Sequence, residues 1–324
     1  MTRITRRAFA AGLLAVPALA RGAAAQWAPS RPIRLIAPYP PGGGVDTTSR
    51  LLAGPMGSFL GQGFVVENRA GAGGSIGAAE LARSAPDGHT LMIDAMAHTV
   101  NPALLRGLPF DYATAFTPIS QVVVVPQLLV VNPNLPARTL PEFVAWAKAR
   151  PGQLSYGSSG NATAAHLAAA LLVQRAGLDI QHVPYRGGTP ALQDVLGGAI
   201  AFVFGTVSSS LQLAREGRLR ALAVTTATRI ASMPEVPTVA EQGFEGYELN
   251  EWNGLYAPAG LPAPVTERVH AAAVHALADA TVRQRLDALG AIPVGTAPAE
   301  FARYLAEQRE LMARVVRDAR IEVG

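Results

Sequence analysis

RLIAPYPPGGGVD, residues Arg34–Asp46, is the most informative segment of the sequence. An apolar run breaks at a proline pair, passes three consecutive glycines and reaches an aspartate. This order predicts a buried strand, a turn without side chains and the start of a helix. The first N–H groups of a helix have no partner inside it, and they lie at the positive end of the helix dipole. We therefore expect a site for an anion, such as a carboxylate or a phosphate, at this turn.

A second turn of the same kind, Gly157–Asn161, also lies between an extended segment and a helical one. Two anion-binding turns in separate parts of the chain predict a cleft between two lobes. The plain alternative for each is a capping turn whose glycines only permit unusual backbone angles. Three consecutive glycines favour close approach of a ligand at the first turn, whereas both interpretations stay open at the second.

The N-terminal segment, residues 1–25, is predicted to be an export signal. Arg6 and Arg7 precede an apolar run, and Ala23–Ala25 resembles a cleavage site before Gln26. The Thr-Arg-Arg-x-Phe pattern favours the twin-arginine route, and ordinary secretory export is the alternative. We therefore expect the mature chain in the periplasm, cleaved near Ala25–Gln26.

Composition excludes several classes of function. Four of the 27 basic residues (Arg3, Arg6, Arg7 and Arg21) lie in the predicted signal, so 23 remain against 23 acidic residues. A mature chain with a formal net charge of zero gives no support to nucleic-acid binding. The chain has no cysteine, which excludes disulfides, a lipoprotein anchor and cysteine-bound metals. The six histidines lack metal-binding spacings and no complete nucleotide-binding motif occurs, so we expect neither metal nor cofactor.

Apolar runs that alternate with helical patterns predict an α/β protein. Extended segments at Gln121–Val131 and near Met233–Thr238 are expected to cross between the lobes. They assign residues 26–124 and 235–324 to the first lobe and residues 125–234 to the second. In the first helix, Pro55 predicts a kink or an early end.

An enzyme remains the alternative of another class. Gly73–Gly77 spells G-x-S-x-G, the motif of a hydrolase nucleophile elbow, which requires its serine directly after a strand. Here Arg69–Ala72 separate the predicted strand from Ser75, which disfavours a secreted serine hydrolase. Replacing Ser75 by alanine would separate the two readings.

A set of motifs along the whole mature chain resembles one family. The motifs, in order, are RPIRLIAPYPPGGGVD, VVENRAGAGGSIGA, APDGHTL, NPAL, VPYRGGTPALQDVLGG, LRALAVTT, PEVPTVAEQGFEGYE and LGAIPVG. Together they resemble the Bug family, the periplasmic substrate-binding proteins of tripartite tricarboxylate transporters. The resemblance implies a two-lobed type II periplasmic-binding-protein fold, with a mixed, mostly parallel sheet in each lobe and a ligand cleft between them. It also implies capture of a small carboxylate by hinge closure, without catalysis.

The resemblance implies a site and partners as well. In the family, backbone amides and hydroxyls of two loops hold the carboxylate, and these match Tyr39–Asp46 and Ser158–His166. We expect a monomer that serves the permease subunits of such a transporter or, alternatively, a sensor kinase. The expected ligand-binding residues are Tyr39, Pro41, Gly42, Gly43, Gly44, Asp46, His98, Ser158, Gly160, Asn161, Thr163, Ala164, Ala165, His166, Tyr185, Gly205 and Thr206.

Departures from the family pattern bear on the ligand. Ala164 and Ala165 replace two serines that the family usually has, which removes two hydroxyl donors. Gly205 stands where an aspartate is usual, and the lack of that acid argues against amino-acid ligands. His98 is also expected to be available to a ligand. We therefore predict a less polar pocket, suited to a carboxylate with an apolar or aromatic body.

Overall fold

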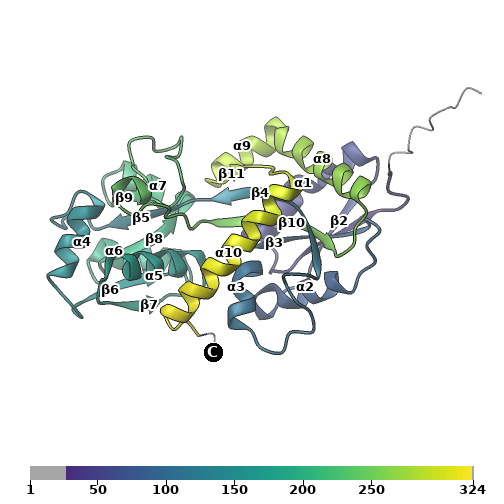
Figure 1. Ribbon diagram of the computed structural model, residues 1–324. Coiled ribbons are helices and arrows are strands. Elements are labelled where there is room, and N and C mark those ends of the chain that lie inside the picture. Colours follow the sequence, from purple (N-terminus) through teal and green to yellow (C-terminus); the bar gives the residue numbers. More distant parts are fainter. Residues whose placement is uncertain (1–26, 323–324) are drawn as a thin grey trace, which may run out of the picture.

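The computed structural model describes residues 27–322 of the 324-residue chain. The predicted export signal and its cleavage point therefore lie outside the described residues. Two lobes lie side by side, each built on one β-sheet with helices on its faces (Figure 1). This arrangement confirms the predicted two-lobed α/β fold. No helix formed by residues 27–322 combines the length and the apolar character needed to cross a membrane.

The first lobe holds a six-stranded sheet of order β11-β4-β10-β3-β1-β2. Its strands are β1 (Ile33–Ala37), β2 (Phe64–Asn68), β3 (Thr90–Ala95), β4 (Phe116–Val125), β10 (Glu251–Pro258) and β11 (Ile292–Pro293). Its helices are α1 (Gly44–Leu60), α2 (Ser75–Ala82), α3 (Ala97–Leu104), α8 (Ala263–Ala278), α9 (Ala280–Ala288) and α10 (Pro298–Asp318).

The second lobe holds a five-stranded sheet of order β7-β6-β8-β5-β9. Its strands are β5 (Gln127–Val131), β6 (Leu154–Ser158), β7 (Ile180–Pro184), β8 (Phe202–Thr206) and β9 (Arg220–Val224). Its helices are α4 (Leu140–Lys148), α5 (Ala164–Ala176), α6 (Gly188–Gly197) and α7 (Val207–Arg215).

Both sheets are mixed, as the sequence predicts. In the first sheet β1, β2, β3 and β4 run one way, and β10 and β11 run against them. In the second sheet β5 runs against the other strands. Strands buried on both faces need nearly continuous apolar runs, and the inner strands β1, β3 and β8 are buried along almost their whole length. In β1, for example, Leu35 packs into one core cluster and Ile36 into another, on the opposite face.

The chain crosses between the lobes at Pro126. The predicted long strand through Val131 is divided here into β4 and β5, because proline lacks the N–H that a sheet ladder requires. At the expected second crossing, Met233 and Val236 pack in the core of the second lobe, and the chain enters the first sheet again at Glu251. The boundary between the lobes at residue 235 stays a prediction.

Helix α10 links the lobes. It lies diagonally across the front of both, shown in yellow in Figure 1, and contacts α3 and β4 of the first lobe and α5 of the second. Its buried residues Phe301, Leu305 and Met312 belong to a core cluster that continues into the second lobe. At its far end, the Asp318 carboxylate accepts a 2.8 Å hydrogen bond from the Gln174 side chain of α5. The two lobes therefore share part of their apolar core.

Of the two outcomes predicted for the first helix, the early end is wrong and the kink stays a prediction. Helix α1 does not end early at Pro55 but continues to Leu60, where Gly61 closes it in a left-handed conformation. The proline removes one backbone hydrogen bond, but Leu52 and Met56 beside it are fully buried in the core formed with α8. Burial of this apolar stripe offsets the local defect.

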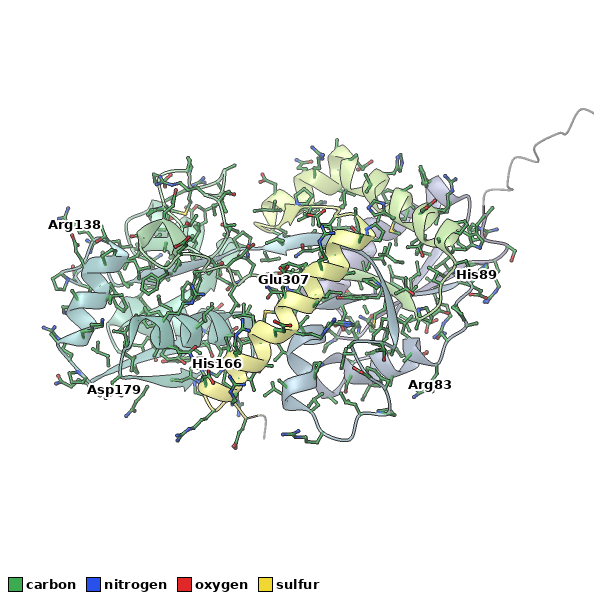
Figure 2. The ribbon with its side chains drawn as sticks, viewed as in Figure 1. Arg83, His89, Arg138, His166, Asp179 and Glu307 are labelled. Atoms are coloured by element: carbon green, nitrogen blue, oxygen red, sulfur yellow. The ribbon has the colours of Figure 1, made fainter. Side chains whose placement is uncertain are left out.

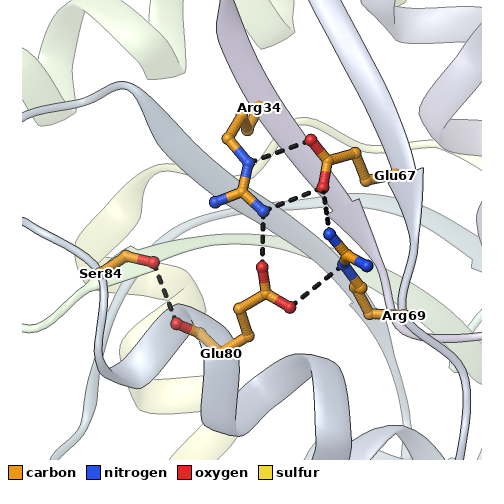
Figure 3. A network of polar contacts seen from close by, with 5 residues as sticks. All are labelled: Arg34, Glu67, Arg69, Glu80 and Ser84. Atoms are coloured by element: carbon orange, nitrogen blue, oxygen red, sulfur yellow. Dashed lines mark hydrogen bonds and ion pairs between the residues drawn. The ribbon is translucent and has the colours of Figure 1, made fainter.

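An ion-pair network joins β1, β2 and α2 (Figure 3). Arg34 of β1 pairs with Glu67 of β2 at 2.9 Å and with Glu80 of α2 at 2.5 Å. Arg69 pairs with the same two carboxylates at 2.9 and 3.2 Å. The side chains are about one third to one half exposed, so each pair contributes about 1 kcal/mol or less. The network fixes α2 against the strand that leads into the loop.

Close packing of α2 on β1 generates the first prediction. A Cβ atom at Gly77 would lie 2.7 Å from Pro38 Cβ and 3.2 Å from the Arg69 carbonyl oxygen. Gly77→Ala should therefore lower the free energy of unfolding, measured by chemical denaturation, by about 1–3 kcal/mol. Gly197→Ala is the control, because this exposed helical glycine has open space around its Cβ position. Equal free energies of unfolding for the two variants would contradict this packing.

Candidate functional site

The ends of strands from both sheets face the space between the lobes. Strand β4 runs toward Pro126 and the second lobe, and β1 and β3 run in the same direction as β4. In the second sheet β5 runs away from Pro126, so β6, β7 and β8 end toward the first lobe. The loops that follow these strands therefore meet across the cleft. Ligands of open α/β sheets bind at such carboxyl ends.

The first glycine loop joins β1 to α1, and Asp46 holds its shape. The Asp46 carboxylate accepts hydrogen bonds from Gly42 N–H at 2.9 Å, from Asn68 at 2.9 Å and from Arg50 at 3.0 Å. Burial raises the pKa of Asp46, but these hydrogen bonds outweigh burial and lower the pKa to about 2. Asp46 is 3% exposed, and its carboxylate is engaged by Gly42, Arg50 and Asn68. Asp46 therefore holds the conformation of the loop.

The loop leaves backbone donors free at the start of α1. The capping residue Gly43 has no side chain to accept from the first turn, and the first helical hydrogen bond is Thr47 N–H to the Gly43 carbonyl. The N–H groups of Gly44, Val45 and Asp46 find no acceptor within residues 27–322. The helix dipole makes this end favourable for a negative charge.

Two of these residues, Gly44 and Val45, line a cavity of ≈ 550 Å³ between the lobes. Thr206 and Ser208, at the start of α7, line its side in the second lobe. The start of α7 also has no side-chain cap, so helix starts from both lobes face one cavity. Its full lining is Tyr39, Pro40, Gly42, Gly43, Gly44, Val45, Thr47, Thr48, Ala95, Val125, Thr206, Ser208, Glu251, Asn253, Leu289 and Ala291.

Sequence reasoning missed the strand that forms one wall of the cavity. Glu251 and Asn253 stand two apart at the start of β10, so they share a face of the sheet. Asn253 Oδ1 accepts a 2.8 Å hydrogen bond from Thr48 of α1. In the sequence only the run around Trp252 marked this strand, and that tryptophan packs against Phe301 and Tyr304 of α10. No local motif indicated that β10 inserts between β3 and β4.

Tyr39 and His98 meet at Asp94, the residue near the end of β3. The Tyr39 hydroxyl donates to Asp94 Oδ1 at 3.0 Å, and His98 Nδ1 lies 3.1 Å from Asp94 Oδ2. The His98 ring is 1% exposed and stacks on Tyr256 with ring centroids 4.1 Å apart. Burial lowers the pKa of His98, which keeps it neutral near pH 7. The structure thus places His98 in the core behind Tyr39, outside the cavity, and we do not include it in the proposed site.

Glycines of the G-x-S-x-G motif serve packing in this structure. Ser75 begins α2 and is 7% exposed. A Cβ atom at Gly74 would lie 3.0 Å from the Tyr39 hydroxyl, and one at Gly77 would overlap Pro38. These glycines allow α2 to approach the first loop closely.

The second loop, Ser158–His166, is held mainly by its own hydrogen bonds. The Ser158 hydroxyl donates to the Gly160 carbonyl at 3.0 Å, and Thr163 Oγ1 donates to the same carbonyl at 2.8 Å. Thr163 also caps α5, accepting from His166 N–H. The N–H groups of Ala164 and Ala165 have no acceptor within the described chain, although both side chains are buried. The loop therefore offers backbone donors at the start of α5.

The two histidines of the second lobe form a stacked pair. His166 and His182 have ring centroids 3.6 Å apart, and His182 Nε2 lies 2.7 Å from the Ser158 hydroxyl. His166 Nδ1 accepts a hydrogen bond from Ala162 N–H at 3.1 Å, so the side chain binds a backbone group of its own loop. Burial lowers the pKa of both rings to about 4, and for His166 the neighbouring His182 adds to the shift.

The second loop does not line the cavity of the first. Asn161 and His166 line a separate space of ≈ 520 Å³ together with Asp318 and Arg320 at the end of α10. Figure 2 shows His166 beside that end of the helix. The structure therefore brings Thr206 to the first loop but keeps the second loop apart.

Two further expected residues have partners of their own. The Tyr185 hydroxyl donates to Asp194 at 2.5 Å, and burial together with this carboxylate raises its pKa to about 12. Gly205 is buried, and a Cβ atom there would overlap the Ser210 side chain. Packing at the start of α7 thus explains the glycine. Pro41 is exposed beside the cavity but does not line it.

Comparison with known proteins decides the family. The family described as the tripartite tricarboxylate transporter family receptor matches residues 48–321. The chain belongs to this family. It is 36% identical to the protein BugT of Bordetella pertussis, over 94% of both chains.

Solved structures agree with this assignment. A Rhodopseudomonas palustris protein solved with adipate is 32% identical, with a TM-score of 0.73, and covers 91% of this chain and 99% of its own. MatC from the same organism, solved with malate, is also 32% identical, with a TM-score of 0.70 and coverages of 89% and 99%. This family member is a solute-binding protein and not an enzyme, so the serine hydrolase alternative is set aside.

The histidine pair predicts a pH dependence of stability. An unfolded histidine titrates near 6.5, whereas these two titrate near 4 in the folded chain. The unfolded chain therefore binds more protons between pH 6.5 and 4, and the free energy of unfolding should fall as pH drops through this window. His166→Asn, whose Oδ1 can accept from Ala162 N–H, should make that fall smaller. Denaturation at pH 7 and pH 5 measures the difference.

The exposed His275 supplies the control. His275→Asn should keep the wild-type change in the free energy of unfolding between the two pH values. The same pH dependence in His166→Asn and the wild type would show that the stacked pair does not titrate as described.

Proposed function

We propose that this chain captures a small carboxylate in the cavity between its lobes, as the periplasmic component of a tripartite tricarboxylate-type transporter. The observation that carries the proposal is the pair of free N–H groups on Gly44 and Val45, two residues that line a cavity shared by both lobes. The relatives solved with adipate and malate support a carboxylate ligand.

The proposed binding step uses charge and exclusion of water. The carboxylate accepts hydrogen bonds from the start of α1, where the helix dipole adds a favourable field. Thr206 and Ser208 contact the ligand from the second lobe. Closure removes water and strengthens these bonds, because their strength rises as the local dielectric constant falls.

The second loop is proposed to join the site when the lobes close. It follows β6, which ends at the same sheet edge as Thr206. Its donors would be the N–H groups of Ala164 and Ala165 and the side chain of Asn161. The alanines remove hydroxyls but leave the backbone donors in place.

The rest of the cavity favours a ligand with an apolar body. Val125, Leu289 and Ala291 belong to its lining, and Leu289 is 40% exposed. Burial of a matching hydrocarbon segment contributes about 0.8 kcal/mol per methylene group. We propose that the loaded, monomeric protein delivers its ligand to the membrane permease subunits.

Blocking the free donors tests the proposal. A Cβ atom at Gly44 meets nothing within 4 Å, so Gly44→Val should fold normally and place its side chain in the cavity. Adipate, malate and a library of small carboxylates are screened by thermal shift. A ligand at 100 times its Kd should stabilise the wild type by about 2.7 kcal/mol. Gly44→Val should lose that stabilisation.

Gly197→Val, on an exposed helix end with free space, serves as the matched control and should keep the wild-type shift. If Gly44→Val bound the same carboxylates as tightly as the wild type, the proposed site would be wrong.

A further inference from the structure

Glu251 places a carboxylate on the wall of the cavity that is proposed to bind a carboxylate. It is the first residue of β10 and lies opposite Val125 of β4 in the sheet register. It lines the cavity together with Gly44 and Ser208, the residues at the two helix starts. Residues with free donors and a residue with a free acceptor therefore line the same cavity.

One of its two oxygens is bound and the other is free. Oε1 accepts from Met96 N–H at 3.0 Å and from its neighbour Trp252 N–H at 2.9 Å. Within residues 27–322, Oε2 accepts no hydrogen bond, and Glu251 takes part in no ion pair. The two backbone bonds fix the carboxyl group on the wall. Its second oxygen is left for a group in the cavity.

Among residues 27–322, no positively charged side chain acts on the pKa of Glu251. Asp94 of β3 adds negative charge, and Tyr39 of the first loop and Tyr304 of α10 are neutral near pH 7. Burial raises the pKa of Glu251 to about 6, so the group is largely ionised at pH 7. An ionised carboxylate favours a hydrogen-bond donor beside it and disfavours another anion.

We infer that Glu251 is a specificity-determining residue, which selects carboxylates that also carry a hydrogen-bond donor, such as a hydroxyl or an ammonium group. The inference rests on the proposed function, since the ligand's own carboxylate is held at the start of α1. A second carboxylate near Glu251 is repelled, whereas a donor gains a charge-assisted hydrogen bond. Apolar residues such as Val125 and Leu289 contact the ligand between its two ends.

This inference changes the sequence-based argument on amine ligands. That argument relied on the absence of an acid at position 205, where Ser210 leaves no space for a side chain. Glu251 supplies an acid to the cavity from a different strand, whereas Gly205 does not line it. Ligands with an amine or a hydroxyl are therefore favoured by the fold.

Matched probes test the inference. One series is hexanoate, 6-hydroxyhexanoate, 6-aminohexanoate and adipate, and a second series has the same end groups on four carbons. Titration calorimetry gives their Kd values at pH 7 for the wild type, Glu251→Gln and Glu248→Gln. The amide of Glu251→Gln can keep both bonds to Oε1, so the fold is retained. Glu248 lies nearby on the chain but does not line the cavity.

In the wild type, at one chain length at least, the amino or hydroxy acid should bind about tenfold or more tightly than the matching dicarboxylate. Glu251→Gln should weaken binding of the amino acid by about tenfold and strengthen binding of the dicarboxylate. Glu248→Gln should leave both ratios unchanged. A purely structural role would weaken all probes equally and leave their ratios intact.

Two results would overturn the inference. The first is a wild type that binds the dicarboxylates at least as tightly as the donor-bearing probes, and the second is an unchanged ratio in Glu251→Gln. In both cases binding that is lost in Gly44→Val would show that the carboxylate site itself stands. A folded wild type that binds none of the probes would instead refute the carboxylate site, and the role of Glu251 with it.

Discussion

The proposed ligand site depends on backbone N–H groups to which the fold gives no hydrogen-bond acceptor. Gly44, Val45 and Asp46 begin α1 with no side chain to cap them, because the residue before them is a glycine. Asp46 turns its carboxylate back onto Gly42 and Asn68, which fixes the loop without filling the donor site. Unpaired donors are costly where water is excluded. We propose that a negatively charged solute removes that cost, so that the uncapped start of the helix contributes to the free energy of binding.

Much of the remaining structure positions these donors. Tyr39 is held by Asp94, which His98 supports from the core, and Gly74 and Gly77 let α2 pack close beneath the loop. Helix α10 lies across both lobes and joins their cores, so any closing motion takes place against this shared contact. A ligand drives closure only through its stronger binding to the closed state. The proposed site is lined by both lobes, so a ligand in it would make more contacts when the lobes are closed.

The sequence predicted the local features of the fold better than its long-range pairings. Asp46, the glycine loop and the strand before it lie within a few residues of each other, and their pattern indicated a strand, a turn and a helix start. The role of Glu251 could not be predicted in this way, since it depends on β10 entering the sheet between strands far away in the chain. His98 shows the reverse problem, because its exposure depends on Tyr256, which only the tertiary fold brings to it. Pro55 does not end α1 early, because the buried apolar residues on either side of it stabilise the helix.

A crystal structure with a bound carboxylate would show whether the start of α1 binds the ligand. A carboxylate oxygen should lie within about 3.2 Å of the Gly44 or Val45 nitrogen, or one ordered water away from it. The solute should lie between the glycine loop and Thr206. A carboxylate bound elsewhere, with these nitrogens facing bulk water, would contradict the account.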